Sequence, residues 1–240
     1  MQIEVFGYTA LGDRRENEDT GTFEKISDHS LCALVCDGLG GHGGGRAASE
    51  TAVGALLQCR QCTQLPTKEQ ILGWMNQANG EILAKRDGPR HMKTTAVFLF
   101  IQNDQAIWAH IGDSRLYHFH NGNLVHYTND HSVCQIAVKL GEITRRDIPN
   151  HPDRSKVLKV LGADSIAPEI HDPIRLEPGE HAFLLCTDGL WERLLEDEIQ
   201  LDLLGAASPE QWLYSLRCRA ERRKSRDVDN NTAVAVFIKE

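Results

Sequence analysis

The sequence predicts a single α+β domain spanning residues 1–240, and three observations support this fold class. With 240 residues, of which 41% are apolar, the chain is long enough to bury one large core. Strand patterns and helical patterns gather in separate stretches, which is typical of α+β proteins. No linker, internal repeat or low-complexity tract divides the chain.

The first third of the chain predicts strands followed by two helices. Residues 2–9 alternate between apolar and polar side chains, as half-buried strands do. The apolar run 31–36 has the length of a buried strand and leads into a glycine-rich loop. Residues 47–57 carry alanines at helical spacing, and residues 67–82 combine a capping box with an apolar helical stripe.

The rest of the chain predicts a run of strands, an irregular segment and a final group of helices. Asn121-Gly122 is a favoured hairpin turn and predicts a strand on each side of it. The segment 131–151 contains glycine and prolines but keeps apolar anchors, so we interpret it as an irregular insertion. The predicted strands are 96–101, 106–111, 115–120, 123–127, 183–186 and 233–238, and the predicted helices are 133–140, 196–204 and 209–222.

Composition excludes several classes of protein. The formal net charge of -8 argues against a nucleic-acid-binding protein, which would present a basic face. The N-terminus lacks the basic and apolar regions of a signal peptide, and no apolar run is long enough to span a membrane. The seven cysteines are odd in number and irregularly spaced, which indicates the reduced thiols of a cytoplasmic protein.

Two smaller patterns offer ligand atoms without the spacing of a known metal site. Cys59 and Cys62 form a lone C-x-x-C, which we interpret as two thiols near a helix end. His118 and His120 share one face of a predicted strand, and although they could be ligands, we interpret them as part of an exposed face.

Four carboxylates lie at the ends of predicted apolar strands. Asp37, Asp113 and Asp188 each follow a strand, and Asp229 precedes one. A single aspartate in this place commonly forms a turn, but four of them suggest one shared site. Because buried carboxylates repel one another, such a site needs divalent cations, and an all-oxygen ligand set favours manganese (Mn²⁺) or magnesium (Mg²⁺) over zinc.

A pair of such ions suits the hydrolysis of a phosphate ester. Two neighbouring ions would share one water molecule, lower its pKa and place it for in-line attack on phosphorus. An arginine would then supply a planar fork for the phosphate oxygens. The candidates are Arg14 and Arg15, which lie in a dense polar patch after the first predicted strand.

Six short motifs follow one another along nearly the whole chain. They are Arg14-x-x-Asn17-Glu18-Asp19, Asp37-Gly38-Leu39-Gly40-Gly41-His42, Gly112-Asp113-Ser114-Arg115, Asp130-His131-Ser132, Thr187-Asp188-Gly189 and Asp229-Asn230-x-Thr232. In content and order they resemble the motifs of the metal-dependent protein phosphatases, the protein phosphatase 2C family in its bacterial form. One such motif would be weak, whereas six in this order are strongly specific.

This resemblance implies a fold, an activity and a cofactor. The fold is a four-layer α-β-β-α sandwich, in which two antiparallel sheets are flanked by helices. The activity is hydrolysis of phosphoserine and phosphothreonine in proteins without a phosphoenzyme. The cofactor is a pair of Mn²⁺ or Mg²⁺ ions at one end of the sandwich, with a third, weaker ion beside it. The partners would be phosphorylated proteins, including a serine/threonine kinase or its substrates.

The resemblance also implies which residues bind the metals. Asp37 would bridge the two ions and act directly in catalysis. Asp188 and Asp229 would complete the first metal site, and the main-chain carbonyl of Gly38 would bind the second ion. Asp113 would belong to the third site.

Other residues would support the metals and the substrate. Arg14 would bind the substrate phosphate, and Glu18 and Asp19 would hold metal-bound water molecules. Asn230 would orient a neighbouring ligand. The segment 131–151 would be a flap beside the active site and would contribute to the choice of substrate.

Two positions depart from the pattern of other relatives. Eukaryotic relatives carry a histidine directly after Asp-Gly as a proposed general acid, whereas this chain has Leu39 there. His42 is the nearest alternative proton donor, and a supporting role behind the ligands is equally open for it. Glu192 stands where relatives often carry aspartate, which would alter the third metal site.

Other interpretations fit the sequence less well. The glycines of 38–43 match a dinucleotide-binding fingerprint, but residues 58–66 do not form the second parallel strand that this fold requires. A P-loop is excluded because no Gly-Lys pair exists, and cysteine phosphatase chemistry because no cysteine precedes an arginine by six residues. The remaining alternative is a catalytically silent relative that binds phosphoproteins, against which the retained aspartates argue. We expect a soluble monomer.

Overall fold

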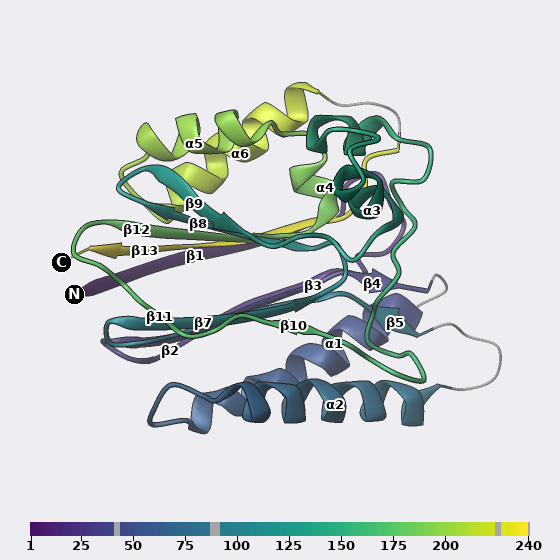
Figure 1. Ribbon diagram of the computed structural model, residues 1–240, viewed down its shortest axis with the longest axis horizontal. Coiled ribbons are helices and arrows are strands. Elements are labelled where there is room, and N and C mark those ends of the chain that lie inside the picture. Colours follow the sequence, from purple (N-terminus) through teal and green to yellow (C-terminus); the bar gives the residue numbers. More distant parts are fainter. Residues whose placement is uncertain (41–43, 87–91, 224–226, 240) are drawn as a thin grey trace.

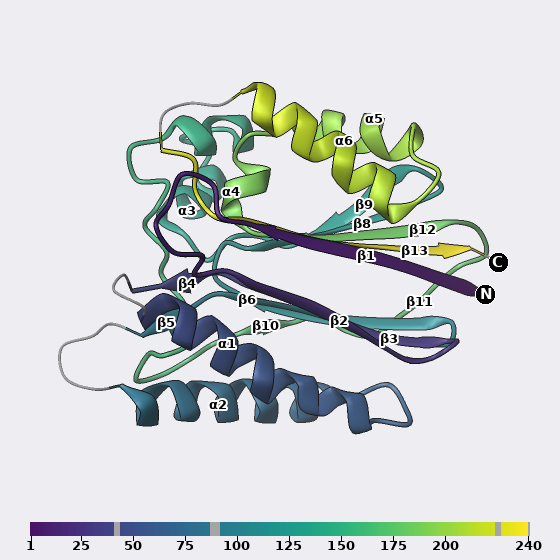
Figure 2. The ribbon, with the colours of Figure 1, turned by 180° about the vertical axis from the view of Figure 1, so that it is seen from behind.

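Two β-sheets lie face to face in the centre of the molecule, and helices cover the outer face of each sheet (Figure 1, Figure 2). The computed structural model describes residues 1–40, 44–86, 92–223 and 227–239. The N- and C-termini lie together at one end of the sandwich, and the short strands β4 (Gly38–Leu39) and β5 (Lys93–Thr94) lie at the other end (Figure 1). The predicted four-layer α-β-β-α sandwich is confirmed.

The first sheet is antiparallel throughout and contains both chain ends. Its strand order is β1, β13, β12, β8, β9. Strands β1 and β13 pair along their whole length, from Gln2 opposite Lys239 to Ala10 opposite Asn231. Asn121 and Gly122 both have positive φ (49° and 75°), as the predicted two-residue turn requires. The bounds are β1 Gln2–Ala10, β8 Arg115–His120, β9 Asn123–Tyr127, β12 His181–Cys186 and β13 Asn231–Lys239.

The second sheet has the order β10, β7, β6, β3, β2, and β11 also pairs with β7. All of these pairs are antiparallel. The bounds are β2 Thr20–Ser27, β3 Ser30–Cys36, β6 Ala96–Gln102, β7 Gln105–Ile111, β10 Glu169–Ile170 and β11 Ile174–Arg175. In the chain, β4 follows β3 and β5 precedes β6, and these two short strands pair with each other in a separate two-stranded ladder.

The helices divide between the two sheets. Helices α1 (Gly44–Leu56) and α2 (Lys68–Lys85) cover the second sheet, and α5 (Glu196–Leu204) and α6 (Pro209–Arg222) cover the first (Figure 1). The predicted capping box opens α2, since Thr67 and Gln70 each bond the other's main-chain N–H through their side chains. The remaining helices are η1 (Leu57–Gln61), α3 (Val133–Lys139), η2 (Arg145–Asn150) and α4 (Asp188–Trp191). None of the helices in the described ranges could cross a membrane, because none is both long and apolar enough.

Three apolar cores hold the four layers together. The central core lies between the sheets and includes Trp108 and Phe183. Met75 of α2 belongs to the core beneath the second sheet, and Trp212 of α6 belongs to the core above the first. Burial of each such side chain stabilises the fold by roughly 2–3 kcal/mol, so the sandwich gives the loops at its ends a rigid base.

The predicted strands and helices are present, with ends that differ by a few residues. Strand β2 was not predicted, because it lies at the edge of its sheet and its residues alternate only between half-buried and exposed. The interpretation of His118 as exposed is wrong. Its side chain points into the layer between the sheets, where Nε2 lies 3.0 Å from Nδ1 of His181 and the ring stacks on Phe183.

Candidate metal centre

Strand direction brings the four aspartates to one end of the sandwich. Strands β3 and β7 both pair antiparallel with β6, so they run in the same direction. Asp37 and Asp113, which follow them, therefore lie at the same end of the sheet. In the first sheet, β12 runs antiparallel to β13, so the end of β12 at Asp188 lies beside the start of β13 at Asp229. The predicted convergence of the strand ends follows from this topology.

The strand ends surround one cavity of about 680 Å³. All four aspartates line it, together with the arginines of the polar patch and two residues that follow the predicted flap. His42 lies outside the described residues. The lining residues are Arg14, Arg15, Glu16, Glu18, Asp37, Gly38, Leu39, Gly40, Asp113, Ser155, Val157, Asp188, Asp229 and Asn230.

The carboxyl groups of this cavity are desolvated and repel one another. Burial, followed by the charge of Asp19, raises the pKa of Asp37 well above its usual value. Burial and Asp188 raise the pKa of Asp113 in the same way. Burial and Asp229 raise the pKa of Asp188 to about 6. A cluster of oxygen ligands with this excess of negative charge fits hard divalent cations such as Mn²⁺ and Mg²⁺.

The main chain around Asp37 is fixed by β5 and the residue after it. The N–H of Asp37 donates to Oγ1 of Thr95 at 2.9 Å, and its carbonyl accepts from Oγ1 of Thr94 at 2.8 Å. Gly38 follows in close contact with the start of α1, where a Cβ on Gly38 would overlap the carbonyl of Gly45. The sequence therefore needs glycine at this position so that the strand end and the helix can meet.

Glu18 lines the aspartate cavity, and the buried Asp19 lies near Asp37 and Asp188. Asp19 is 7% exposed and accepts a hydrogen bond from Oγ1 of Thr187 at 2.9 Å. Burial, followed by Asp188, raises its pKa to about 7. The Glu18 carboxylate accepts from the N–H of Gly45 at 3.2 Å, which ties the polar patch to the start of α1. Sequence reasoning found both carboxylates but not Thr187 as the hydrogen-bond donor to Asp19.

Asn230 connects the polar patch to the start of β13. Its Oδ1 accepts from the N–H of Glu18 at 2.9 Å, and its Nδ2 donates to the carbonyls of Leu11 and Glu16. Its own N–H donates to Oδ1 of Asp229 at 2.8 Å. Asn230 therefore ties the polar patch to the start of β13 beside Asp229, and its role in orienting a ligand stays a prediction.

Arg14 reaches the cavity from the same patch. Its Nη2 donates to Oδ2 of Asp229 at 2.7 Å, and its side chain is 54% exposed.

Glu192 lies in a neighbouring hollow, 3.6 Å from Arg154. Burial and the charge of Asp188 raise the pKa of Glu192 to about 7. That hollow measures about 750 Å³ and is lined by η2 of the predicted flap, and it shares Arg14 and Asp229 with the aspartate cavity.

Asp113 is supported by side chains to which the sequence alone assigned no role. Nε1 of Trp191 donates to the main-chain carbonyl of Asp113 at 3.0 Å. The guanidinium of Arg115 lies 3.4 Å above the Trp191 ring. The same guanidinium donates twice to Asp130, each time at 2.7 Å. Arg115 and Asp130 belong to two of the six motifs, but only the fold shows that they meet.

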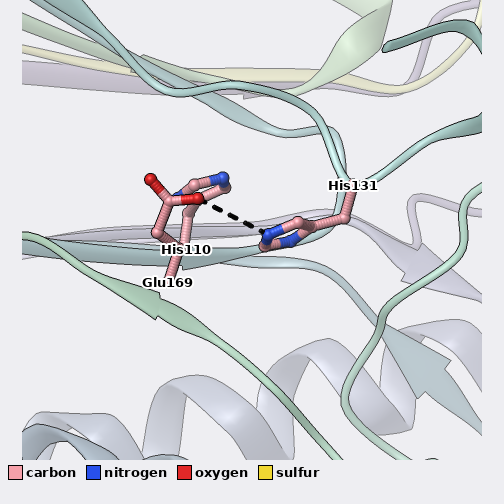
Figure 3. A group of neighbouring side chains, drawn as sticks. All are labelled: His110, His131 and Glu169. Atoms are coloured by element: carbon pink, nitrogen blue, oxygen red, sulfur yellow. Dashed lines mark ion pairs between the residues drawn. The ribbon is translucent and has the colours of Figure 1, made fainter. Parts of the chain in front are cut away.

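A second group of ligand-type side chains consists of His110, His131 and Glu169 (Figure 3). Within the described ranges, His110, His131 and Glu169 are the only three such residues whose ligand atoms all lie within 4.8 Å of one another. No three of the cavity aspartates, all of which the structure describes, bring their ligand atoms this close together. The two imidazole rings are stacked in parallel, with 2° between planes and 4.6 Å between centroids. Because each nitrogen lone pair lies in its ring plane, rings stacked in this way do not point at one ion, and we assign no metal to this group.

Comparisons with known proteins agree with this geometry. A family model described as "Protein phosphatase 2C" matches residues 6–222. The serine/threonine phosphatase stp of Listeria welshimeri is 32% identical over 195 residues, which are 78% of this chain and 77% of that protein.

Two solved structures show the same fold. The serine/threonine phosphatase PstP/Ppp of Mycobacterium tuberculosis has a TM-score of 0.87 at 24% identity, over 100% of each chain. The catalytic domain of PstP in complex with two manganese ions has a TM-score of 0.83 at 23% identity, over 99% of each chain. From the family match and the Listeria relative together, the chain belongs to the protein phosphatase 2C family.

Proposed function

We propose that this chain hydrolyses phosphoserine and phosphothreonine in proteins with two Mn²⁺ or Mg²⁺ ions. The observation that carries the proposal is the meeting of Asp37, Asp188 and Asp229 in one cavity. Burial and mutual repulsion raise the pKa of Asp37 and of Asp188, and divalent cations would remove this repulsion. That a phosphatase with the same fold has been solved with two manganese ions is consistent with this assignment.

The strand-end residues would divide the ions between them. Asp37 would contact both ions, Asp188 and Asp229 the first, and the carbonyl of Gly38 the second, while Asp113 would hold a third, weaker ion. When bound, the ions supply an acidified water and neutralise charge on the phosphoryl group. Because hydrogen bonds hold the main chain of Asp37, its carboxylate would stay at the cavity while the substrate reacts.

Arg14 would bind the substrate phosphate. It lines the cavity and donates to Asp229 through Nη2, and since no other bond of its guanidinium is seen within the described residues, the remaining donors would be available to a phosphate. Glu18 and Asp19 would hold water molecules of the ions from behind, and Asn230 would keep Asp229 in place. The role of His42 stays a prediction.

The substrate would be a protein segment that extends beyond the phosphorylated residue. The adjoining hollow offers room for it, and Arg146 of the flap lines that hollow together with Arg154 and Arg193. We also propose that residues 1–240 act as one domain, as a cytoplasmic monomer in signalling that opposes a serine/threonine kinase. The net charge of -8 supports the absence of a nucleic-acid partner.

The test is hydrolysis of a phosphothreonine peptide by metal-stripped protein, to which Mn²⁺, Mg²⁺ or Zn²⁺ is returned. We expect Mn²⁺ or Mg²⁺ to restore turnover, and Asp37→Asn to remove it under every condition while the circular dichroism spectrum stays unchanged. Folded wild-type protein that stays silent with every metal but still binds the phosphopeptide would replace this proposal with the phosphoprotein-binding alternative.

A further inference from the structure

His131 fastens the loop that carries Asp113. The N–H of His131 donates to the carbonyl of Gly112 at 2.9 Å, and the N–H of Gly112 donates back to Nδ1 of His131 at 3.2 Å. Gly112 has a φ of 109°, and a Cβ there would meet Thr95, so this position requires glycine. Because glycine is conformationally free, the two hydrogen bonds to His131 restrict the residue directly before Asp113.

The same histidine closes the base of the predicted flap. Its carbonyl accepts from the N–H of Leu158 at 2.7 Å, and the next residue, Ser132, forms a β-bridge with Val157. Val157 lines the aspartate cavity. His131 therefore joins the Asp113 loop to both ends of the segment that borders the cavity.

The imidazole ring of His131 is itself held in position (Figure 3). It stacks on His110, whose Nε2 donates to the carbonyl of Asn129 at 2.8 Å. Since Nδ1 of His131 accepts a hydrogen bond, the proton of the neutral ring is on Nε2, which lies 3.9 Å from a carboxylate oxygen of Glu169. Burial favours this neutral form by lowering the pKa of His131 to about 3.

We propose that His131 is a positioning residue for Asp113, acting through the hydrogen bond from Gly112 to its Nδ1 and held in place by the stacked ring of His110. The inference rests on the proposed function, in which Asp113 binds the third, weaker ion. Loss of this hydrogen bond leaves the fold intact but lets the main chain before Asp113 change its conformation. Removing a residue that orients a metal ligand in this way typically weakens metal binding by roughly 10–100-fold.

The central experiment compares His131→Asn with His131→Leu. The Oδ1 of asparagine can take the place of Nδ1 as the acceptor for the Gly112 N–H, whereas leucine fills similar space without an acceptor. His126→Leu is the matched control, since His126 packs on Trp108 of the second sheet and, among the described residues, forms no hydrogen bond with Gly112. Mn²⁺ binding is measured by titration with detection of free ion, together with exchange of the Gly112 amide proton in the metal-free protein.

We expect His131→Leu to weaken the lowest-affinity Mn²⁺ step by roughly tenfold and to speed exchange of the Gly112 amide. His131→Asn and His126→Leu should remain within about threefold of wild type in both measurements. In Asp113→Asn that Mn²⁺ step should be missing, and adding His131→Leu should then have no further effect, because both act on the same site.

Three outcomes would overturn the inference, and each points to a different cause. If Asp113→Asn leaves Mn²⁺ binding unchanged, the assignment of Asp113 in the proposed function fails as well. If Asp113→Asn removes a step that His131→Leu preserves, Asp113 is a ligand but His131 does not position it. Equal losses in His131→Asn and His131→Leu would show that the ring, rather than the acceptor, matters. Should His131→Leu not fold, His131→Gln replaces it, because its longer side chain moves the acceptor away from Gly112.

Discussion

Two sets of carboxylates lie at the same end of this molecule, and the protein compensates their charge differently. Asp130 is fully covered and receives two hydrogen bonds from the buried guanidinium of Arg115. Asp37 and Asp188 are open to a cavity, and within the described residues no arginine or lysine forms an ion pair with either. A carboxylate that is paired with an arginine of the chain has a structural role. A carboxylate that is left to repel its neighbours favours binding of a cation from solution.

The largest expected effect tests the uncompensated set. Asp37→Asn should lower turnover of a phosphothreonine peptide about a thousandfold or more, since metal assistance is worth several kcal/mol of transition-state stabilisation. The metal-free variant should be at least as stable as metal-free wild type, because the change removes a repelling charge. Steady-state kinetics and urea unfolding measure the two effects, and near-normal turnover would remove Asp37 from the metal centre.

The opposite result is expected for the compensated set. Asp130→Asn should lower the free energy of unfolding by about 3–5 kcal/mol, because it leaves the charge of Arg115 buried without its partner. Urea unfolding of metal-free protein makes the comparison with Asp37→Asn direct. If the two variants lose similar stability, the distinction between the two sets of carboxylates is wrong.

The pH dependence of metal-free protein sharpens the same comparison. Burial and Asp229 raise the pKa of Asp188 to about 6 from an ordinary value of 3.8, so the folded protein binds this proton more tightly than the unfolded chain does. Its stabilising contribution is present in acid and is lost as the pH rises through about 6. This loss begins above pH 3.8, where the unfolded chain releases the proton, so Asp188→Asn should gain more stability relative to wild type at about pH 8 than at about pH 5.

The quantity to measure is the difference in stability between variant and wild type, because the buried histidines make stability depend on pH in the opposite direction. Burial lowers the pKa of His118 and of His131 to about 3, so their contribution is lost as the pH falls below 6.5. Thermal unfolding of both proteins at the two pH values gives the difference. A gain from Asp188→Asn that is larger in acid would contradict the expected sign.

The smallest expected effect concerns Arg14, which pairs with Asp229, a proposed metal ligand. Arg14→Ala should raise KM for the phosphopeptide about tenfold with little change in kcat, since a hydrogen bond to a charged group contributes roughly 1.5–3 kcal/mol. Arg14→Lys should recover part of this loss, because it restores the charge without the planar fork. Arg15→Ala is the control, and the two arginines exchange roles if only this variant raises KM.

The strand pattern of the sequence predicted most of the metal centre. An apolar run ends directly before Asp37, and two others end with one residue left before Asp113 and before Asp188. These ends lie at one end of the sandwich because neighbouring antiparallel strands return the chain to it. Edge strand β2 escaped prediction because its residues are only half-buried. His118 was misread for a related reason: a period of two shows that residues share a face but not whether that face meets water or a second sheet.

The sequence by itself therefore determined the family, the fold class and the identity of the aspartates, since these depend on local patterns and short motifs. Only the tertiary structure decided which side chains support them. Thr187 reaches Asp19 across 168 positions of sequence, and Trp191 reaches the carbonyl of Asp113 across 78. Contacts between residues so far apart in sequence leave no periodic pattern in it, because they form only after the two sheets have packed and brought their loops to a common end.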